Sequence, residues 1–459
     1  MNDTIAAIST SLGIGSISII RISGEESLKI VNKIFKGKDL EKCESHTINY
    51  GYIVDNNEKI DEVLVSIMLA PKSFTRENVV EINCHGGIAS TNKILELLLL
   101  NGCRLAEPGE FSKRAYLNGR IDLVEAEAIM SLIEAETESK RKLAIEQLSG
   151  NVSKMIKELR KKLADIESNI RVNIDYPEYE DIEVMTINML KTRLKNVKQE
   201  ISKILKESSN GSLIEKGIKT SIIGKPNVGK SSLLNLLLNK EKAIVTSIQG
   251  TTRDTVEGNI IINGILYKLI DTAGIRKTSD IVENIGVKKS IELIDNSDLI
   301  LLIFDNNLEI NEDEYKVLEH IKNKNCIIVI NKIDLPKKIN KEILKKYSKN
   351  IIEISTYTKT GIEELKDEML KIFNLENIET KSLNYLSSSR SIAILKECET
   401  IINDIYDGIE KNMPIDMIEI DLNNLFEKLG EITGDTYDEE LIDHMFANFC
   451  LGKWVYTHF

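Results

Sequence analysis

The sequence has little tryptophan, histidine, proline and cysteine, and it has no long hydrophobic run. Of its 459 residues, one is Trp, five are His, six are Pro and six are Cys. The cysteines are scattered, with no Cys-x-x-Cys pair and no histidine at metal spacing, which argues against a disulfide scaffold and a zinc site. No stretch reaches the roughly 18 to 20 uncharged apolar residues of a membrane helix, and the first residues lack the cationic start of a signal peptide. We therefore expect a cytoplasmic protein with no membrane partner.

The sequence also has fewer basic than acidic residues. Lys and Arg total 60 against 72 Asp and Glu, so the formal net charge is −12. A generally cationic surface for nucleic acid is excluded, and any RNA contact must be local or provided by a partner. The 42% hydrophobic content is sufficient for packed cores. At roughly 150 residues per domain, the length suggests about three domains.

Residues 1 to about 118 have the pattern of a compact α+β domain. Short β-type runs at 16–22, 63–70 and 79–84 alternate with turn signals and one helical stretch at 93–100. From residue 123 the apolar residues recur at spacings of three and four, which predicts two helical stripes. The first is Ile145, Leu148, Val152, Ile156, Leu159, Leu163, Ile166 and Ile170, and the second is Ile187, Leu190, Leu194, Val197, Ile201 and Ile204. Such stripes are typical of a coiled coil or bundle core and carry no activity by themselves.

From about residue 217 the pattern changes to strands separated by helices. Strands are predicted at 218–223, 260–270 with a break at Asn263-Gly264, 299–305, 326–330 and 351–354. This alternation indicates a mostly parallel sheet with helices on both faces. Helical periodicity returns after about residue 373. We therefore predict a multidomain α/β and α protein: an N-terminal α+β domain (1–118), a helical domain split into 119–216 and 375–459, and an inserted α/β domain (217–374).

The strongest motif is Gly-Lys-Pro-Asn-Val-Gly-Lys-Ser at 224–231. It follows a predicted strand and precedes a predicted helix, which is the context that a P-loop requires. Its glycines let backbone amides curl around phosphates, Lys230 would neutralise the β and γ oxygens, and the Ser231 hydroxyl would bind Mg2+. The motif predicts a nucleoside triphosphate site.

A second motif identifies the base. Asn331-Lys332-Ile333-Asp334 lies at the end of a predicted strand. The Asp334 carboxylate can accept from guanine N1–H and from the 2-amino group, and adenine lacks this pair of donors. Ser355-Thr356, at another strand end, fits the last guanine-contacting loop. The predicted nucleotide is GTP.

A third group of motifs indicates hydrolysis. Asp271-Thr272-Ala273-Gly274 fits the sensor of magnesium and γ-phosphate, and Thr252 within Gly-Thr-Thr-Arg-Asp at 250–254 could bind Mg2+ from a switch loop. Ile275 stands where Ras-type enzymes use a glutamine to orient water. We therefore expect the catalytic group to come from elsewhere, either from a carboxylate such as Glu283 or from a cation in place of an arginine finger.

Several strings outside these motifs carry a resemblance to a known family. They are Ile-Arg-Ile-Ser-Gly at 20–24, Ser-Phe-Thr at 73–75, Val-Glu-Ile at 80–82, His-Gly-Gly at 85–87, Pro-Gly-Glu-Phe-Ser at 108–112, Leu-Asn-Gly-Arg-Ile-Asp-Leu at 117–123, Leu-Gly-Glu-Ile-Thr-Gly at 429–434 and Phe-Cys-Leu-Gly-Lys at 449–453. Through them, the chain from Ile5 to Lys453 resembles the MnmE (TrmE) family of tRNA uridine-modification GTPases.

The resemblance implies a homodimer with an N-terminal tetrahydrofolate-binding domain, a split helical domain and a potassium-activated GTPase domain. It also implies an FAD-binding partner, MnmG, in a heterotetramer or larger complex that acts on tRNA. The complex would use a one-carbon unit from 5-formyl- or 5,10-methylene-tetrahydrofolate. The product would be a (carboxymethyl)aminomethyl group at C5 of the wobble uridine. FAD would come only through the partner.

The same resemblance implies roles for individual residues. It gives K+ contacts at Asn227, Thr246, Ile248 and Thr251, Mg2+ contacts at Ser231 and Thr252, folate contacts at Arg21, Glu81, Arg120 and Lys453, a catalytic glutamate at Glu283, and a functional cysteine at Cys450. Ser247 stands where many members carry Asp in the potassium loop. The full predicted GTP-binding set is Asn227, Val228, Gly229, Lys230, Ser231, Ser232, Thr246, Ser247, Ile248, Gln249, Gly250, Thr251, Thr252, Asp271, Thr272, Ala273, Gly274, Asn331, Lys332, Asp334, Ser355 and Thr356.

Two other functions fit part of the pattern. A regulatory switch in ribosome assembly would use the same nucleotide motifs without folate chemistry, but it would be expected to carry a basic RNA-binding module, against the charge of −12. A structural coiled-coil protein would not need a complete hydrolytic switch. The basic run Lys154, Lys157, Arg160, Lys161 and Lys162 is either a solvated helix face or a contact to tRNA phosphates.

Overall fold

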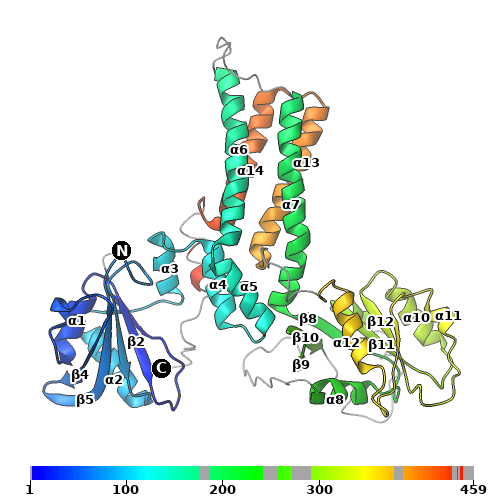
Figure 1. Ribbon diagram of the computed structural model, residues 1–459, viewed down its shortest axis with the longest axis horizontal. Helices are drawn as coiled ribbons and strands as arrows, with labels where there is room; N and C mark the ends of the chain where they lie inside the picture. The colour runs from blue at the N-terminus through cyan, green and yellow to red at the C-terminus, as the bar shows by residue number, and fades with distance from the viewer. Residues whose placement is uncertain are drawn as a thin grey trace. The chain divides into compact units, whose positions relative to one another are not determined.

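The computed structural model describes residues 3–175, 187–240, 256–270, 291–376, 386–436, 442 and 445–447 (Figure 1). The chain divides into two compact units. Unit 1 comprises Met1–Met130 and Phe426–Phe459, and unit 2 comprises Ser131–Leu425. No helix in the described part of the chain is long and apolar enough to cross a membrane. The division into four domains stays a prediction.

Unit 1 is built on a seven-stranded sheet with the order β3-β4-β5-β6-β2-β1-β7. All neighbours are antiparallel except β1 and β7, which are parallel. Alternate strand residues and two helices form one buried apolar core. The strands are β1 (Ile5–Ile8), β2 (Ser18–Ser23), β3 (Phe35–Lys36), β4 (Thr47–Asp55), β5 (Glu58–Met68), β6 (Val79–Cys84) and β7 (Arg104–Leu105). The helices are α1 (Ser27–Ile34), α2 (Ile88–Leu100), α3 (Glu110–Leu117) and the part of α4 (Leu123–Ile133) up to residue 130, with a 3-10 turn at Leu40–Lys42.

A buried ionic cluster joins α3 to the sheet of unit 1. Arg114 is 1% exposed, and its guanidinium lies 2.7 Å from Asp3, 2.9 Å from Glu110 and 3.2 Å from Glu77. Arg104 reaches the same two carboxylates of Asp3 and Glu110, at 2.7 and 2.5 Å. Burial alone would raise the pKa of Glu110, but hydrogen bonds from Arg104 and Arg114 outweigh it and hold that pKa below its usual range. The string at 108–112 that carries part of the family resemblance therefore supplies a structural ion pair.

His85, which follows β6, pairs with a carboxylate of β5. Its Nδ1 lies 2.7 Å from Asp61 Oδ1, and its backbone N–H donates to Asp61 Oδ2 at 2.9 Å. The hydrogen bond and the charge of Asp61 raise the pKa of His85 above the usual value of 6.5. The stability that the protonated His85–Asp61 pair contributes is fully present below a pH of about 6.5. It is lost as the pH rises through the raised pKa of His85.

We expect NMR titration of the five histidines to show His85 as a group with a pKa above 6.5, because protonation completes its ion pair with Asp61. Asp61→Asn should bring that pKa back to about 6.5. Glu58→Gln, also on β5, is the matched control. A titration of His85 that is the same in all three proteins would contradict the assignment.

The α/β part of unit 2 is a six-stranded sheet with the order β13-β12-β11-β8-β10-β9. Only β9 runs antiparallel, and it joins β10 through Asn263 and Gly264, both with left-handed φ values of 47° and 78°. The break predicted at Asn263-Gly264 is confirmed as a two-residue hairpin turn, but β9 begins at Val256 and not at the predicted residue 260. The strands are β8 (Ile218–Ile223), β9 (Val256–Ile262), β10 (Ile265–Ile270), β11 (Leu299–Asp305), β12 (Cys326–Asn331) and β13 (Ile351–Glu353).

Helices cover both faces of this sheet, as the sequence predicts. Leu299, Leu301 and Ile303 of β11 pack in one core with α8 (Lys230–Lys240) and α12 (Ile362–Lys371). The alternating residues Ile300, Leu302 and Phe304 pack in a second core with α10 (Glu312–His320) and α11 (Lys341–Leu344). A strand buried on both faces reads as a continuous apolar run, which is why its bounds could be predicted.

Long helices form the rest of unit 2 (Figure 1). They are α5 (Glu138–Leu148), α6 (Asn151–Asp175), α7 (Ile187–Lys216), α13 (Ser389–Glu410) and the part of α14 (Ile415–Thr433) up to residue 425. The predicted stripes are confirmed from Val152 to Ile170 and from Leu190 to Ile204, all of whose members are buried. The prediction was wrong at Ile145 and Leu148, because the chain turns at Ser149-Gly150 and these residues belong to a separate helix. Ile187 is 44% exposed at the first position of α7 and lies outside the core.

Candidate guanine nucleotide site

The loop between β8 and α8 has the conformation expected of a phosphate-binding loop. Asn227 and Gly229 have left-handed φ values of 61° and 102°. A Cβ on Gly229 would collide with the side-chain amide of Asn331, so only glycine fits at this position. The first amides of α8 follow directly, and a helix N-terminus attracts anions.

Lys230 lies at the first position of α8 with its ammonium turned back onto the loop. Its Nζ donates to the carbonyls of Gly224 and Lys225 at 2.6 and 2.5 Å. Burial lowers its pKa, and within the described ranges no carboxylate pairs with it. A half-buried ammonium among backbone amides fits an anionic phosphate, and the adjacent hydroxyl of Ser231 fits a Mg2+ ligand.

Asn331 joins three segments that are far apart in the sequence. Its Nδ2 donates to Val228 O at 2.8 Å, and its Oδ1 accepts from the backbone N–H of Thr356 at 3.0 Å. The side chain is fully buried at the carboxyl end of β12. The structure therefore brings the phosphate-binding loop, the Asn-Lys-Ile-Asp motif and the Ser355-Thr356 loop together. Ligands of open α/β sheets bind at this edge.

Asp334 is exposed on the same edge and is held by the buried Ser355. Ser355 Oγ donates to Asp334 Oδ1 at 2.5 Å, which leaves the other carboxylate oxygen available to a base. Lys332 has a left-handed φ of 62°, and its ammonium lies 2.6 Å from Asp305. This ion pair fixes the Lys332 side chain beside the place where the guanine base would lie.

Two residues at this site were not predicted from the sequence. Asp305 is 7% exposed at the end of β11 and pairs with Lys332. Glu314 of α10 lies 2.8 Å from Lys225 of the loop and also caps its own helix. The position of Asp305 at a strand end was an available signal. The pairing of Lys225 with Glu314 depends on how α10 packs, which the motif does not contain.

Several predicted site residues lie outside the described residues. They are Thr246, Ser247, Ile248, Gln249, Gly250, Thr251, Thr252, Asp271, Thr272, Ala273, Gly274, Glu283, Cys450 and Lys453. The five other cysteines are free and buried. No cluster of His, Cys, Asp and Glu suited to a metal occurs within the ranges that the structure describes.

Two of the predicted folate residues of unit 1, Arg21 and Arg120, lie beside Phe74. Arg21 and Glu81 are direct partners across β2 and β6, and Arg21 Nε donates to Glu81 Oε1 at 2.7 Å. The guanidinium carbons of Arg21 and Arg120 lie 5.7 and 4.8 Å from the centre of the Phe74 ring. Phe74 and Arg120, with Lys72 and Arg76, line a hollow of about 520 Å³.

This hollow suits a flat ring with an anionic tail. Phe74 offers a stacking face, and the cations attract carboxylates. Glu81 does not line the hollow, and its carboxylate accepts from Arg21. Of the three described residues predicted to bind folate, only Arg120 lines the hollow directly. The residues present fit a tetrahydrofolate.

The sheet, the phosphate-binding loop and the Asn331 contacts define unit 2 as a P-loop nucleotide-binding protein with the sequence motifs of the GTPases. Two family-level sequence models also match the chain. The one described as "GTP-binding protein TrmE N-terminus" matches residues 4–120, and the one described as "MnmE helical domain" matches residues 123–450.

Curated relatives match over almost the whole chain. The tRNA modification GTPase MnmE of Ligilactobacillus salivarius is 48% identical over 457 residues, which are 98% of each protein. Its counterpart from Bacillus mycoides is 50% identical over 455 residues, which are 98% of this chain and 99% of the relative. The chain therefore belongs to the MnmE family of tRNA modification GTPases.

A solved G domain gives a weaker likeness. The G domain of the T. maritima FeoB iron transporter is 25% identical and covers 34% of this chain and 98% of its own length. The TM-score is 0.25, which is too low to support a structural argument.

Proposed function

We propose that this chain is a potassium-activated GTPase that works with an FAD-binding, MnmG-like partner. Together they use a tetrahydrofolate one-carbon unit to install a (carboxymethyl)aminomethyl group at C5 of the wobble uridine of tRNA. The main support for GTP binding is the Asn331 side chain, which hydrogen-bonds both to Val228 of the phosphate-binding loop and to Thr356. Family membership supports the part played in tRNA modification.

In this proposal different residues of the described site bind the phosphates, Mg2+ and the guanine base. Backbone amides from Asn227 to Ser232 hold the phosphates, with Lys230 as the countercharge. The Ser231 hydroxyl would hold Mg2+, which would supply positive charge to the phosphates. Asp334, oriented by Ser355, reads the guanine edge.

Potassium would be held beside the same loop. Asn227 is exposed with a left-handed φ of 61°, so its side chain lies at the surface of the phosphate-binding loop. The other proposed contacts are Thr246, Ile248 and Thr251. A bound monovalent cation would supply the positive charge that an arginine finger supplies elsewhere.

Glu283 is proposed to orient the attacking water, because Ile275 cannot. Glu283→Ala should leave GTP affinity within about twofold and lower kcat by about 100-fold, the lower end of the effect of a general base. Single-turnover GTP hydrolysis in potassium measures the rate. The matched control is Glu292→Ala, further along the chain. An unchanged rate in Glu283→Ala would remove Glu283 from the mechanism.

Arg21→Ala should weaken tetrahydrofolate binding about tenfold or more, because a cation beside the anionic ligand and the partner of Glu81 are both lost. GTP hydrolysis should not change, since the nucleotide site lies in unit 2. Isothermal titration with 5-formyl-tetrahydrofolate measures the affinity. Lys36→Ala, an exposed residue of β3, is the control. Equal loss of folate binding and GTP hydrolysis would indicate misfolding and contradict the assignment.

The whole proposal is tested by reconstitution. A tRNA transcript with a wobble uridine is incubated with this protein, the FAD-binding partner, GTP, a tetrahydrofolate and an amine donor, and its nucleosides are analysed by mass spectrometry. We expect the C5 adduct only in the complete mixture. Adduct formation without folate, or in the absence of this protein, would contradict the proposal.

A further inference from the structure

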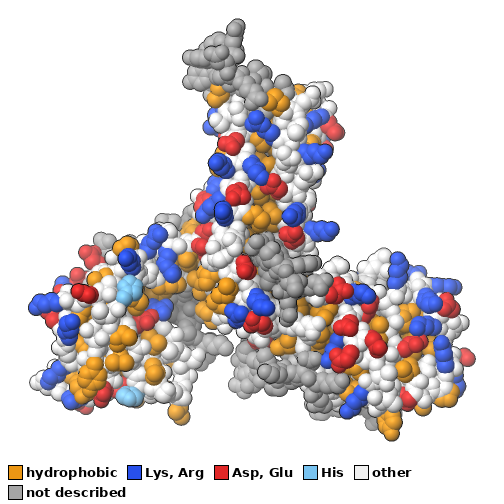
Figure 2. All heavy atoms as spheres, in the orientation of Figure 1, with side chains coloured by type: hydrophobic (Ala, Val, Ile, Leu, Met, Phe, Trp, Pro, Cys, Tyr) orange, Lys and Arg blue, Asp and Glu red, His pale blue; other side chains and the backbone are white. Residues whose placement is uncertain are grey.

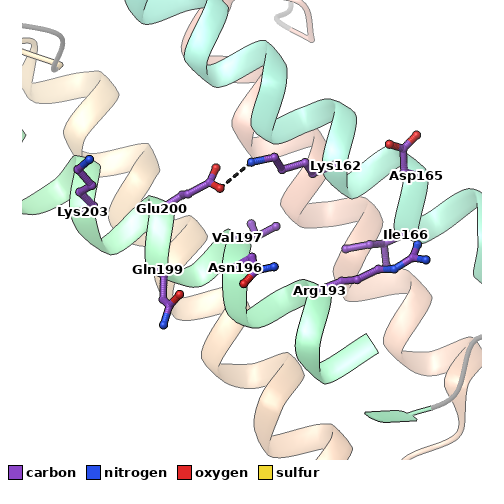
Figure 3. A pocket seen from close by; sticks show the side chains of 9 residues that line it. All are labelled: Lys162, Asp165, Ile166, Arg193, Asn196, Val197, Gln199, Glu200 and Lys203. Carbon is purple, nitrogen blue, oxygen red and sulfur yellow. Dashed lines mark hydrogen bonds and ion pairs between the residues drawn. The ribbon is translucent and has the colours of Figure 1, made fainter. Parts of the chain in front are cut away.

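A groove between α6 and α7 in unit 2 combines cations from both helices. Its volume is about 530 Å³. Figure 3 shows Lys162 of α6 reaching toward Glu200 of α7. Asp165 of α6 and Arg193 and Lys203 of α7 also line the groove. The lining also includes the apolar residues Ile166 and Val197. None of the nine residues that line the groove is aromatic.

The helices that form the groove are basic, although the protein has a net charge of −12. Figure 2 shows Lys and Arg side chains along the pair α6 and α7. Their basic residues are Lys154, Lys157, Arg160, Lys161, Lys162, Arg171, Lys191, Arg193, Lys195, Lys198, Lys203, Lys206 and Lys216, and their acidic residues are Glu158, Asp165, Glu167, Asp175, Glu200, Glu207 and Glu215. Cations therefore outnumber carboxylates on this pair.

The neighbouring helix α13 has the opposite balance. It carries Arg390 and Lys396 against Glu397, Glu399, Asp404, Asp407 and Glu410. Compared with α13, the pair α6 and α7 therefore carries an excess of positive charge. An anionic partner that the whole protein repels would be attracted to this pair.

The cations of the groove can exchange their present contacts for phosphates. Lys162 lies 2.6 Å from Glu200, but these side chains are 48% and 41% exposed, and an exposed pair contributes only about 0 to 1 kcal/mol. Lys161 and Lys203 are exposed and make no ion pair with any residue that the structure describes. The basic run from Lys154 to Lys162 extends for about 12 Å along α6, at 1.5 Å per residue.

We propose that this basic groove binds the phosphate backbone of a helical stem of tRNA. The inference rests on the proposed function, in which tRNA is the substrate. The groove offers no aromatic face on which successive unpaired bases could stack, so it suits the backbone of a duplex, which is recognised by shape and charge. Asn196 and Gln199 add neutral groups that can hydrogen-bond to 2′-hydroxyls. A protein partner would be expected to find aromatic or Met anchors in the centre of the surface, and the groove has neither.

The test is the affinity of the full-length protein for a tRNA transcript, measured by fluorescence anisotropy over a range of KCl concentrations. Lys162→Ala with Lys203→Ala should bind about tenfold more weakly at moderate salt, and the slope of log K against log salt should fall by about 2. The matched control is Lys396→Ala with Lys411→Ala, which makes the same change in net charge at exposed positions of α13 and its C-terminus. The control should bind like wild type.

Measurement of GTP hydrolysis distinguishes an error in the groove assignment from an error in the proposed function. Both double variants should hydrolyse GTP at the wild-type rate. An equal loss of tRNA affinity in the two double variants would show a general charge effect and overturn the groove. Unchanged tRNA affinity of the groove variant, combined with reduced uridine modification, would also overturn it and point to an acidic partner protein. Failure of the wild type to hydrolyse GTP would contradict the proposed function instead.

Discussion

Asp334→Asn should convert the nucleotide preference from GTP to xanthosine triphosphate. The carboxylate can accept from two guanine donors, whereas an amide must place its own N–H2 against one of them. Loss of this match should weaken GTP binding by about 3 kcal/mol, or roughly 100-fold. Xanthine carries a carbonyl in place of the 2-amino group, so the amide nitrogen can donate to it.

Ser355 makes this prediction more specific. Its hydroxyl holds Oδ1 of Asp334 at 2.5 Å and accepts from the backbone N–H of Thr358 at 3.1 Å. In Asp334→Asn the amide oxygen should keep this contact, which turns the amide nitrogen toward the base. Ser355→Ala is therefore the matched control, expected to weaken GTP binding without a gain in xanthosine triphosphate. Competition binding with both nucleotides measures the preference, and retained GTP preference in Asp334→Asn would refute the base assignment.

Arg114→Met should destabilise unit 1 by about 3 to 5 kcal/mol, the usual cost of removing one partner from a buried ionic cluster. The variant leaves Glu110, which is 3% exposed, without its most buried cation. Arg104→Met is the control, because Arg104 contacts the same carboxylates but is 43% exposed. Its effect should be smaller, because the guanidinium of Arg104 is already partly hydrated and Glu110 keeps its buried partner Arg114. Hydrogen exchange of α3 and β1 measures the local stability, and equal effects of the two variants would contradict the role of the buried guanidinium.

The cluster also predicts a response to acid. Burial acts to raise the pKa of Asp3 and Glu110, but the two arginines overcome it and lower both pKa values. A lowered pKa contributes stability above the unfolded value of about 4, and this stability is lost as the pH falls through the folded value. Wild-type unit 1 should therefore lose protection below about pH 4, and Arg114→Met should lose it at a higher pH.

Much of the fold could be predicted because buried segments show characteristic patterns of apolar residues in the sequence. The strands at 79–84, 218–223 and 299–305 have the predicted bounds, since runs of apolar residues end where the sheet ends. The stripe from Val152 to Ile170 is buried for the same reason. The prediction of one continuous helix was wrong at Ile145. The apolar spacing continues through Ser149-Gly150, but the helix ends there and a new one begins.

Contacts between distant charged residues could not be predicted in this way. Asp3 and Arg114 are 111 positions apart, and each by itself is an ordinary surface residue type. At the nucleotide site, the motif predicted Asn331 and Asp334, but not Asp305, whose partner Lys332 is fixed only when β11 and β12 lie side by side. Sequence patterns give the residues that recognise a ligand, whereas the folded chain gives those that hold them.

In the mechanism that we propose, a potassium ion replaces the arginine finger of other GTPases. The most direct test of this mechanism is steady-state GTP hydrolysis by the purified protein in potassium and in sodium at equal ionic strength, with association followed in the presence of GDP and a γ-phosphate transition-state mimic. We expect a much faster rate in potassium than in sodium, together with association of two GTPase domains. Equal rates in the two salts would contradict the cation-assisted mechanism and would favour a switch activated by a partner.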